Sequence, residues 1–151
     1  MKTRTNRLTV IAILTALSLV LGRFIMIPTP NGFLTLLDAG IYFTAFYFGK
    51  KEGAIVGGLA AFLLDLLAGY PQWMFISLFA HGAQGYLAAW SGRGRWLGLS
   101  LASLVMVGTY FLASWGFYGL GAALADVLGN FLQNVVGMAL GFTLAKIFSK
   151  T

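Results

Sequence analysis

Apolar runs, separated by short segments that contain glycine, proline or charged residues, make up most of the chain. A helix needs about 20 mainly apolar residues, with a range of about 17–25, to cross the hydrocarbon core of a membrane. Runs near that length predict membrane-spanning helices at residues 8–27, 35–49, 53–68, 73–91, 96–117 and 122–147. The second and third runs are short by this measure. The pattern predicts an all-α membrane protein with six transmembrane helices in one bundle.

The segments between the runs leave no room for a second domain. Pro28 and Pro30, followed by Asn31 and Gly32, predict an irregular loop after the first run. The other connections are short turns, and no repeat or linker interrupts the chain. We therefore expect residues 1–151 to form a single domain.

The basic residues fall on one side of this layout. Of the 10 Lys and Arg residues, all but Arg23 lie before the first run, after or at the end of the sixth, or in two alternate connections. They are Lys2, Arg4, Arg7, Lys50, Lys51, Arg93, Arg95, Lys146 and Lys150. Short cytoplasmic loops retain Lys and Arg in preference to exported loops. We therefore expect a multi-pass protein with both termini in the cytoplasm.

Composition agrees with a membrane protein and excludes several other classes. Hydrophobic residues make up 59% of the chain and charged residues only 9%, which no soluble domain of this length could accommodate. The net charge of +6 lies in short clusters beside the apolar runs. Such clusters contact anionic lipids of the bilayer, so we do not expect a nucleic-acid partner. Basic residues also precede the first run, but it continues to Ile27 without a clear cleavage site, so we expect a retained helix rather than a signal peptide.

Signatures of catalysis are missing from the sequence. There is no Cys for a thiolate nucleophile or metal ligand, and the only histidine is His81. The segment Gly49-Lys50-Lys51 lacks the spacing and the hydroxyl of a phosphate-binding loop. We therefore expect no catalytic residue, no metal and no cofactor, and no ATP hydrolysis by this chain.

The sixth run carries the clearest functional signal. Polar residues recur there at i, i+4, i+7 and i+8, which places them on one face of a helix. They are Asp126, Asn130, Gln133 and Asn134. A charged side chain well inside a bilayer costs about 2.5–3.5 kcal/mol on insertion scales, so it normally faces the bundle interior or a cavity. The stripe either lines a polar cavity or bonds neighbouring helices together, and we favour the cavity.

Other polar and aromatic residues gather at the same depth. Trp73, Ser77, His81 and Gln84 form one stripe on the fourth run, and Tyr110, Ser114 and Trp115 lie on the fifth. Most of these, together with Arg23 and Asp38, fall in the outer half of the layout, whereas the inner half is almost purely apolar. The asymmetry predicts a pocket open to the outside rather than a continuous channel, which would need polar lining across the full depth.

Small residues at four-residue spacing mark two helix faces that can approach another helix closely. Gly53, Gly57 and Ala61 form such a face on the third run, where packing within the bundle explains it. Ala12 and Ala16 form another on the first run, in the cytoplasmic half. For this second face we also consider a partner protein.

Four motifs resemble one known family. Residues 38–43 read Asp-Ala-Gly-Ile-Tyr-Phe, residues 53–58 Gly-Ala-Ile-Val-Gly-Gly, residues 65–70 Asp-Leu-Leu-Ala-Gly-Tyr, and residues 81–85 His-Gly-Ala-Gln-Gly. They are similar to segments of the substrate-binding S components of energy-coupling factor (ECF) vitamin transporters, and nearest to the branch for hydroxymethylpyrimidine and vitamin B6. The chain departs from that branch at Leu37, where Gly is common, and at His81 and Gln84, where Lys and Glu are common.

The resemblance implies a subunit that captures a small vitamin or precursor from outside, in a prokaryotic cytoplasmic membrane. Its partners would be a transmembrane coupling subunit, the T component, and two ATP-binding cassette ATPase subunits. Ala12 and Ala16 would form the face that docks on the T component. A pocket with Trp, Tyr, Asn, Gln and His side chains suits a flat polar heterocycle.

Two other functions stay open at this point. A stand-alone secondary carrier for a small heterocycle would need no ATPase partner, but the sequence has no visible two-fold repeat. A non-transporting membrane assembly subunit would use the polar stripes only to bind its helices together.

Overall fold

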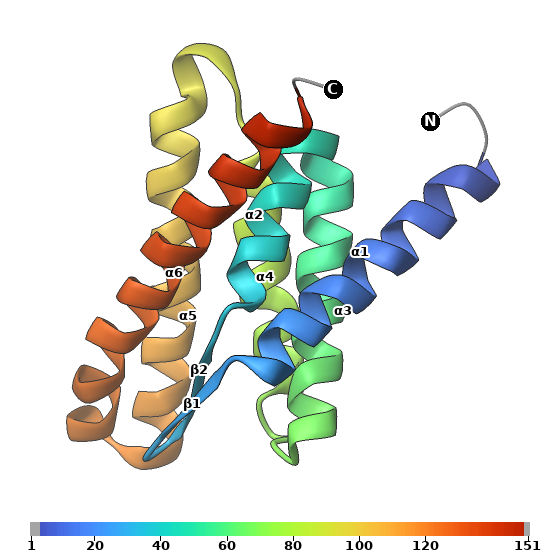
Figure 1. The fold of residues 1–151 in the computed structure, drawn as a ribbon. Coiled ribbons are helices and arrows are strands. Elements are labelled where there is room, and N and C mark those ends of the chain that lie inside the picture. The colour runs from blue at the N-terminus through green and yellow to red at the C-terminus, as the bar shows by residue number, and fades with distance from the viewer. Residues whose placement is uncertain (1–3, 150–151) are drawn as a thin grey trace.

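The computed structural model describes residues 4–149, which form six α-helices and one two-stranded β-hairpin (Figure 1). The elements in chain order are α1 (Arg4–Phe24), β1 (Met26–Thr29), β2 (Gly32–Thr35), α2 (Leu37–Phe48), α3 (Lys50–Ala68), α4 (Met74–Ala88), the short 3₁₀ helix η1 (Gly92–Gly94), α5 (Arg95–Tyr118) and α6 (Leu120–Phe148). The six helices expected from the apolar runs are therefore confirmed.

The connections lie at two opposite ends of the bundle. Figure 1 shows the start of α1, the α2–α3 connection, η1 and the end of α6 at one end. The hairpin and the α3–α4 and α5–α6 connections lie at the other end. Except for Arg23, all basic residues that the structure describes lie at the end of the bundle that contains the start of α1 and the end of α6. We call this the basic end, and we call the opposite end, which contains β1 and β2, the hairpin end. Arg23 lies in the last turn of α1, beside the hairpin end.

Three helical segments are long and apolar enough to cross a membrane: Arg4–Phe24, Gly92–Tyr118 and Leu120–Phe148. The chain is therefore a membrane protein. Helix α2 has 12 residues and α4 has 15, which correspond to about 18 and 22 Å at 1.5 Å per residue. A hydrocarbon core is about 30 Å thick, so each of these two helices by itself is shorter than that depth.

The hairpin corrects the irregular loop that we expected after the first run. Its strands pair antiparallel, from Met26 opposite Thr35 to Thr29 opposite Gly32. Two prolines concealed the strands, because proline interrupts regular strand patterns and the strands are only four residues long. A hairpin of this size is marginal by itself, so its contacts with the helices stabilise it.

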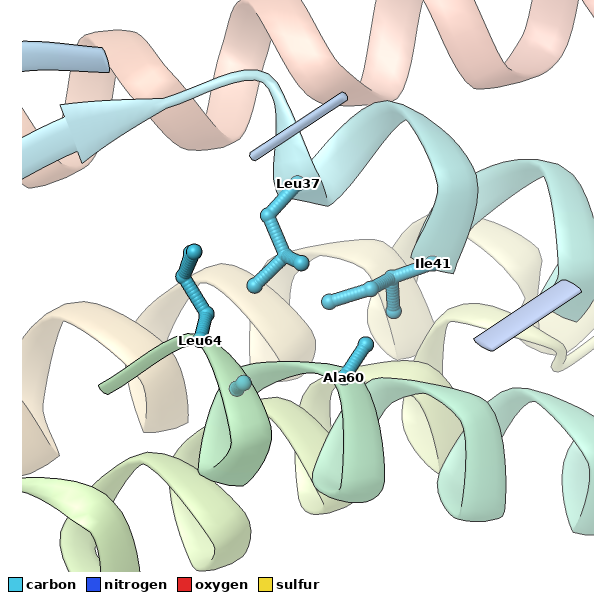
Figure 2. Close-up of a cluster of buried hydrophobic side chains, with 5 residues drawn as sticks. Leu37, Ile41, Ala60 and Leu64 are labelled. Carbon is cyan, nitrogen blue, oxygen red and sulfur yellow. The ribbon is translucent and has the colours of Figure 1, made fainter. Parts of the chain in front are cut away.

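Helices α2, α3 and α4 pack closely at the centre of the molecule. Figure 2 shows a cluster of buried side chains between α2 and α3 that includes Leu37, Ile41, Ala60 and Leu64. At the interface between α3 and α4, the two backbones approach closely: a Cβ atom on Gly53 of α3 would lie only 2.7 Å from the carbonyl oxygen of Gly85 on α4. The small face on the third run therefore packs within the bundle, as expected. Ala12 and Ala16 are exposed on the outer face of α1.

Candidate functional site: a polar cavity at the hairpin end

A cavity of about 390 Å³ lies at the hairpin end, between the hairpin, the end of α3 and helices α4, α5 and α6. Pockets for small molecules have volumes of about 300–1,000 Å³. Seven of the binding residues expected from the sequence line this cavity: Trp73, Ser77, His81, Tyr110, Asp126, Asn130 and Gln133. Residues from the fourth, fifth and sixth runs thus meet around one space.

The polar stripe of α6 holds the hairpin over the cavity. Asp126 accepts hydrogen bonds from Asn31 Nδ2 at 3.2 and 3.3 Å, and from Ser114 Oγ at 2.8 Å. About two helical turns further along α6, Gln133 Oε1 accepts a hydrogen bond of 2.7 Å from the backbone N–H of Thr35. Both side chains therefore join the hairpin to α6, and Ser114 acts on the site through Asp126.

Aromatic side chains form the wall on the α4 and α5 side. The ring centroid of Trp73 lies 5.7 Å from that of Tyr110 and 5.3 Å from that of Phe117. Tyr110 also hydrogen bonds Ser77 Oγ at 2.6 Å, and its ring lies 5.7 Å from the ring of His81. Flat aromatic faces of this kind suit stacking on a planar ring.

A second polar layer lies deeper, toward the centre of the bundle. His81 Nδ1 lies 2.7 Å from Gln84 Oε1 and 3.1 Å from Asp38 Oδ1. Because Nδ1 has these partners, Nε2 is the ring nitrogen left for the cavity. Asp38 and Gln84 do not line the cavity themselves; both are completely buried and hold the His81 ring in place.

Asn134 belongs to this deeper layer as well. Its Oδ1 accepts hydrogen bonds from Tyr42 OH at 2.6 Å and from Ser103 Oγ at 3.0 Å. The side chain is 0% exposed and does not line the cavity. Asn134 thus joins α6 to α2 and α5, which is the helix-bonding role that we considered for the whole stripe.

Two expected residues lie away from the cavity. Trp115 is 51% exposed and packs its ring against Phe111 on the outside of α5. Arg23 is exposed at the end of α1. The structure does not bring either side chain to the cavity lining.

Asp65, Tyr70 and Asn31 are among the cavity-lining residues that were not sequence-based candidates for binding. Asp65 lies near the end of α3, and Tyr70 follows that helix and contacts Phe33 of the hairpin edge-on at 5.3 Å. Asn31 comes from the hairpin turn. Asp65 carried a usable signal, since a carboxylate inside an apolar run is costly. The other two carried none, because they belong to connections.

The cavity is acidic. Asp65 and Asp126 line it, and among residues 4–149 no Lys or Arg side chain does. His81 is the one other titratable group besides the tyrosines in the described lining. No group of three or more His, Asp or Glu residues that could hold a metal ion occurs in the described part of the chain. The lining therefore suits a neutral or cationic molecule that carries hydrogen-bond donors, and it disfavours anions.

The fold and the cavity define a helical membrane protein with a polar cavity of a size that suits a small molecule. A family model described as "ECF-type riboflavin transporter, S component" matches residues 2–150. The chain belongs to this family of transporter components, and the resemblance drawn from the four motifs is confirmed.

Individual relatives agree with this assignment. The chain is 49% identical over 149 residues to the thiamine precursor transporter HmpT of Lactococcus lactis subsp. cremoris (strain MG1363), covering 97% of this chain and 89% of that protein. It is 33% identical over 132 residues to an uncharacterized protein of Pyrococcus woesei, covering 83% and 88%. The solved S component of a bacterial ECF transporter superposes with a TM-score of 0.77 at 23% identity and covers 98% of both chains. That structure supports the fold.

Proposed function

We propose that the chain is the substrate-capture subunit of an ATP-driven importer, and that it binds hydroxymethylpyrimidine, a precursor of thiamine. The observation that carries the proposal is the acidic, aromatic-walled cavity in a chain 49% identical to a thiamine precursor transporter. The family model is named after riboflavin, which has three fused rings and a long polyol chain. A cavity of about 390 Å³ is near the lower end of the range for small-molecule sites, and this favours a ligand with a single ring.

The lining supports a flat heterocycle in two ways. Trp73 and Tyr110 offer ring faces for stacking. Asn130, Gln133 and His81 offer donors and acceptors that can pair with ring nitrogens and hydroxyl groups. Because the lining contains two carboxylates and, among residues 4–149, no Lys or Arg, the free hydroxymethyl form is favoured over its phosphate ester. Pyridoxine-like molecules share the size and flatness and are natural competitors.

The position of the cavity supports capture from outside. The basic end faces the cytoplasm under the rule for Lys and Arg, so the hairpin end and the cavity face outside. This arrangement has six crossings of a prokaryotic cytoplasmic membrane with both termini inside. The exposed face with Ala12 and Ala16 lies near the middle of α1, where a T component would dock with its two ATPase subunits.

Native mass spectrometry and calorimetric titration of the purified protein test the ligand. We expect a retained small molecule with the mass of hydroxymethylpyrimidine, and tighter binding of that compound than of pyridoxine, riboflavin or hydroxymethylpyrimidine phosphate. Comparable binding of the phosphate ester would contradict the acidic-site reasoning. Tight binding of riboflavin with none of hydroxymethylpyrimidine would overturn the proposed substrate.

Coupling is tested separately from binding. Co-expression with a T component and its ATPases should give uptake that depends on ATP hydrolysis, and the chain should co-purify with them. Uptake by this chain without any ATPase subunit would identify a secondary carrier instead.

A further inference from the structure

Two buried polar atoms in the cavity lining lack hydrogen-bond partners among the described residues. They are Oδ2 of Asp65 and Nε1 of Trp73, on side chains that belong to residues only 6% and 7% exposed. More than about 90% of buried polar groups in proteins are hydrogen bonded, so an unpaired one calls for an explanation. One of these two atoms is an acceptor and the other is a donor.

The surroundings of Asp65 leave one of its two carboxylate oxygens without a hydrogen-bond partner. The residue lies in the last turn of α3, where its backbone carbonyl accepts hydrogen bonds from the N–H groups of Gly69 and Tyr70. That end of a helix carries the negative pole of the macrodipole, which disfavours a carboxylate. The Asp65 side chain interacts with Ser77 and with the imidazole of His81, and Tyr110 in turn hydrogen bonds Ser77.

The second carboxylate of the cavity differs in this respect. Asp126 receives hydrogen bonds on both of its oxygens, from Asn31 and from Ser114. Its acceptor capacity is therefore partly used by the protein itself in holding the hairpin. Of the two cavity carboxylates, only Asp65 presents a buried oxygen with no partner in the described part of the chain.

The geometry points to Asp65 as the residue that determines specificity for an exocyclic amino group on the ligand. In this assignment, which rests on the proposed function, Asp65 Oδ2 accepts a hydrogen bond from the amino group of an aminopyrimidine. Trp73 Nε1 donates to a ring nitrogen or hydroxyl of the same molecule, so that both unpaired atoms are satisfied. A binding site built around a hydrogen-bond partner rejects analogues that lack that partner, because its own buried group is then left unpaired.

The first arm of the test varies the ligand and leaves the protein unchanged. Purified protein is titrated with hydroxymethylpyrimidine and with its oxo analogue, in which an oxygen replaces the amino group. The oxo oxygen would face the Asp65 carboxylate, so we expect affinity for the oxo analogue to be lower by roughly tenfold or more. Equal affinity for the two compounds would overturn the assignment, and this arm needs no variant to fold.

The second arm changes the protein. Asp65→Asn keeps the shape of the side chain but adds an amide donor that can pair with the oxo oxygen. We expect weaker binding of hydroxymethylpyrimidine by roughly tenfold or more, with the ratio of the two affinities moving toward one. The matched control is Glu52→Gln, which makes the same change near the start of the same helix, where Glu52 pairs with Arg7 at 2.7 Å, far from the cavity lining. That variant should keep the wild-type ratio.

The outcomes separate the assignment from the proposed function. An Asp65→Asn protein that binds with the wild-type preference for the amino compound would overturn the role of Asp65 alone. A wild-type protein that binds neither pyrimidine would overturn the proposed substrate and this assignment together. A variant can give a smaller heat of binding in the titration because its affinity is lower or because less of it is folded. Its melting curve and its binding stoichiometry distinguish these two causes.

Discussion

Two asparagines on the same face of α6 are predicted to respond to the same substitution in opposite ways. Asn134 is completely buried and bonded to two other helices, whereas Asn130 lines the cavity and makes no side-chain hydrogen bond with another described residue. Replacing either with leucine removes its polar groups while keeping an apolar helix former in a membrane helix. Each variant is thus the control for the other.

The expected loss of stability in Asn134→Leu follows from its partners. The substitution leaves Tyr42 OH, on a residue 0% exposed, and Ser103 Oγ without their shared acceptor. Hydrogen bonds between membrane helices average about 0.6 kcal/mol each, and an unsatisfied buried group costs about 1–3 kcal/mol. A loss of about 1–3 kcal/mol lowers the melting temperature by about 2–12 °C, at about 2–4 °C per kcal/mol for a chain of this size. Because Asn134 does not touch the cavity, protein that remains folded should keep its affinity.

Asn130→Leu should have the reverse effect. It breaks no hydrogen bond within the described structure, so the melting temperature of the ligand-free protein should stay close to that of the wild type. A ligand that used Asn130 would lose about 1–3 kcal/mol of binding free energy, and about 1.4 kcal/mol corresponds to a tenfold change in Kd. Fluorescence-monitored melting in detergent and calorimetric titration with hydroxymethylpyrimidine measure the two quantities on the same samples.

The comparison can fail in a clear way. If Asn130→Leu lowers the melting temperature as much as Asn134→Leu and leaves the affinity for a demonstrated ligand unchanged, the entire stripe bonds helices together. The distinction between a cavity-facing and a bundle-facing asparagine would then be wrong.

Three further predictions concern topology, docking and packing. Because the chain has no Cys, a single Cys at Asn31 should react with an impermeant reagent from outside and one at Gly94 only from inside; the opposite labelling would exclude the proposed orientation. Ala12→Trp and Ala16→Trp should reduce uptake by separating α1 from its partner while ligand binding persists, and normal uptake would show that this face does not dock. Gly57→Val should destabilise the protein by about 1–3 kcal/mol, since the new Cβ atom would collide with the backbone of His81; an unchanged melting temperature would contradict this packing.

The helices were predictable because hydropathy is a local property of the sequence. The fifth run was placed at 96–117 and the helix α5 occupies Arg95–Tyr118. The hairpin was not predictable, because its strands are held by distant partners. The backbone N–H of Thr35 bonds Gln133, and Asn31 bonds Asp126, across 98 and 95 residues of sequence. A local pattern contains no information about such contacts.

The candidate site, like the fold, was predictable only as far as local sequence patterns reach. Helical periodicity placed Trp73, Ser77 and His81 on one face, and all three line the cavity. Periodicity could not separate Asn130 from Asn134, since a difference of four residues keeps the face but changes the depth and the neighbours. Depth decides whether the side chain meets open space or the packed centre of the bundle.

The four acidic residues of the chain differ in how many contacts their carboxylates make. Glu52 pairs with Arg7, Asp38 lies 3.1 Å from His81, and Asp126 is bonded by Asn31 and Ser114. A carboxylate deep in a membrane costs about 2.5–3.5 kcal/mol on insertion scales, and in these three cases contacts within the chain offset part of that cost. Buried carboxylate oxygens without a hydrogen-bond partner in the described structure occur on Asp38 and Asp65, and of these two residues only Asp65 lies in the wall of the cavity. A ligand with a hydrogen-bond donor can satisfy the Asp65 oxygen there, so binding can compensate a carboxylate that the chain itself leaves partly unpaired.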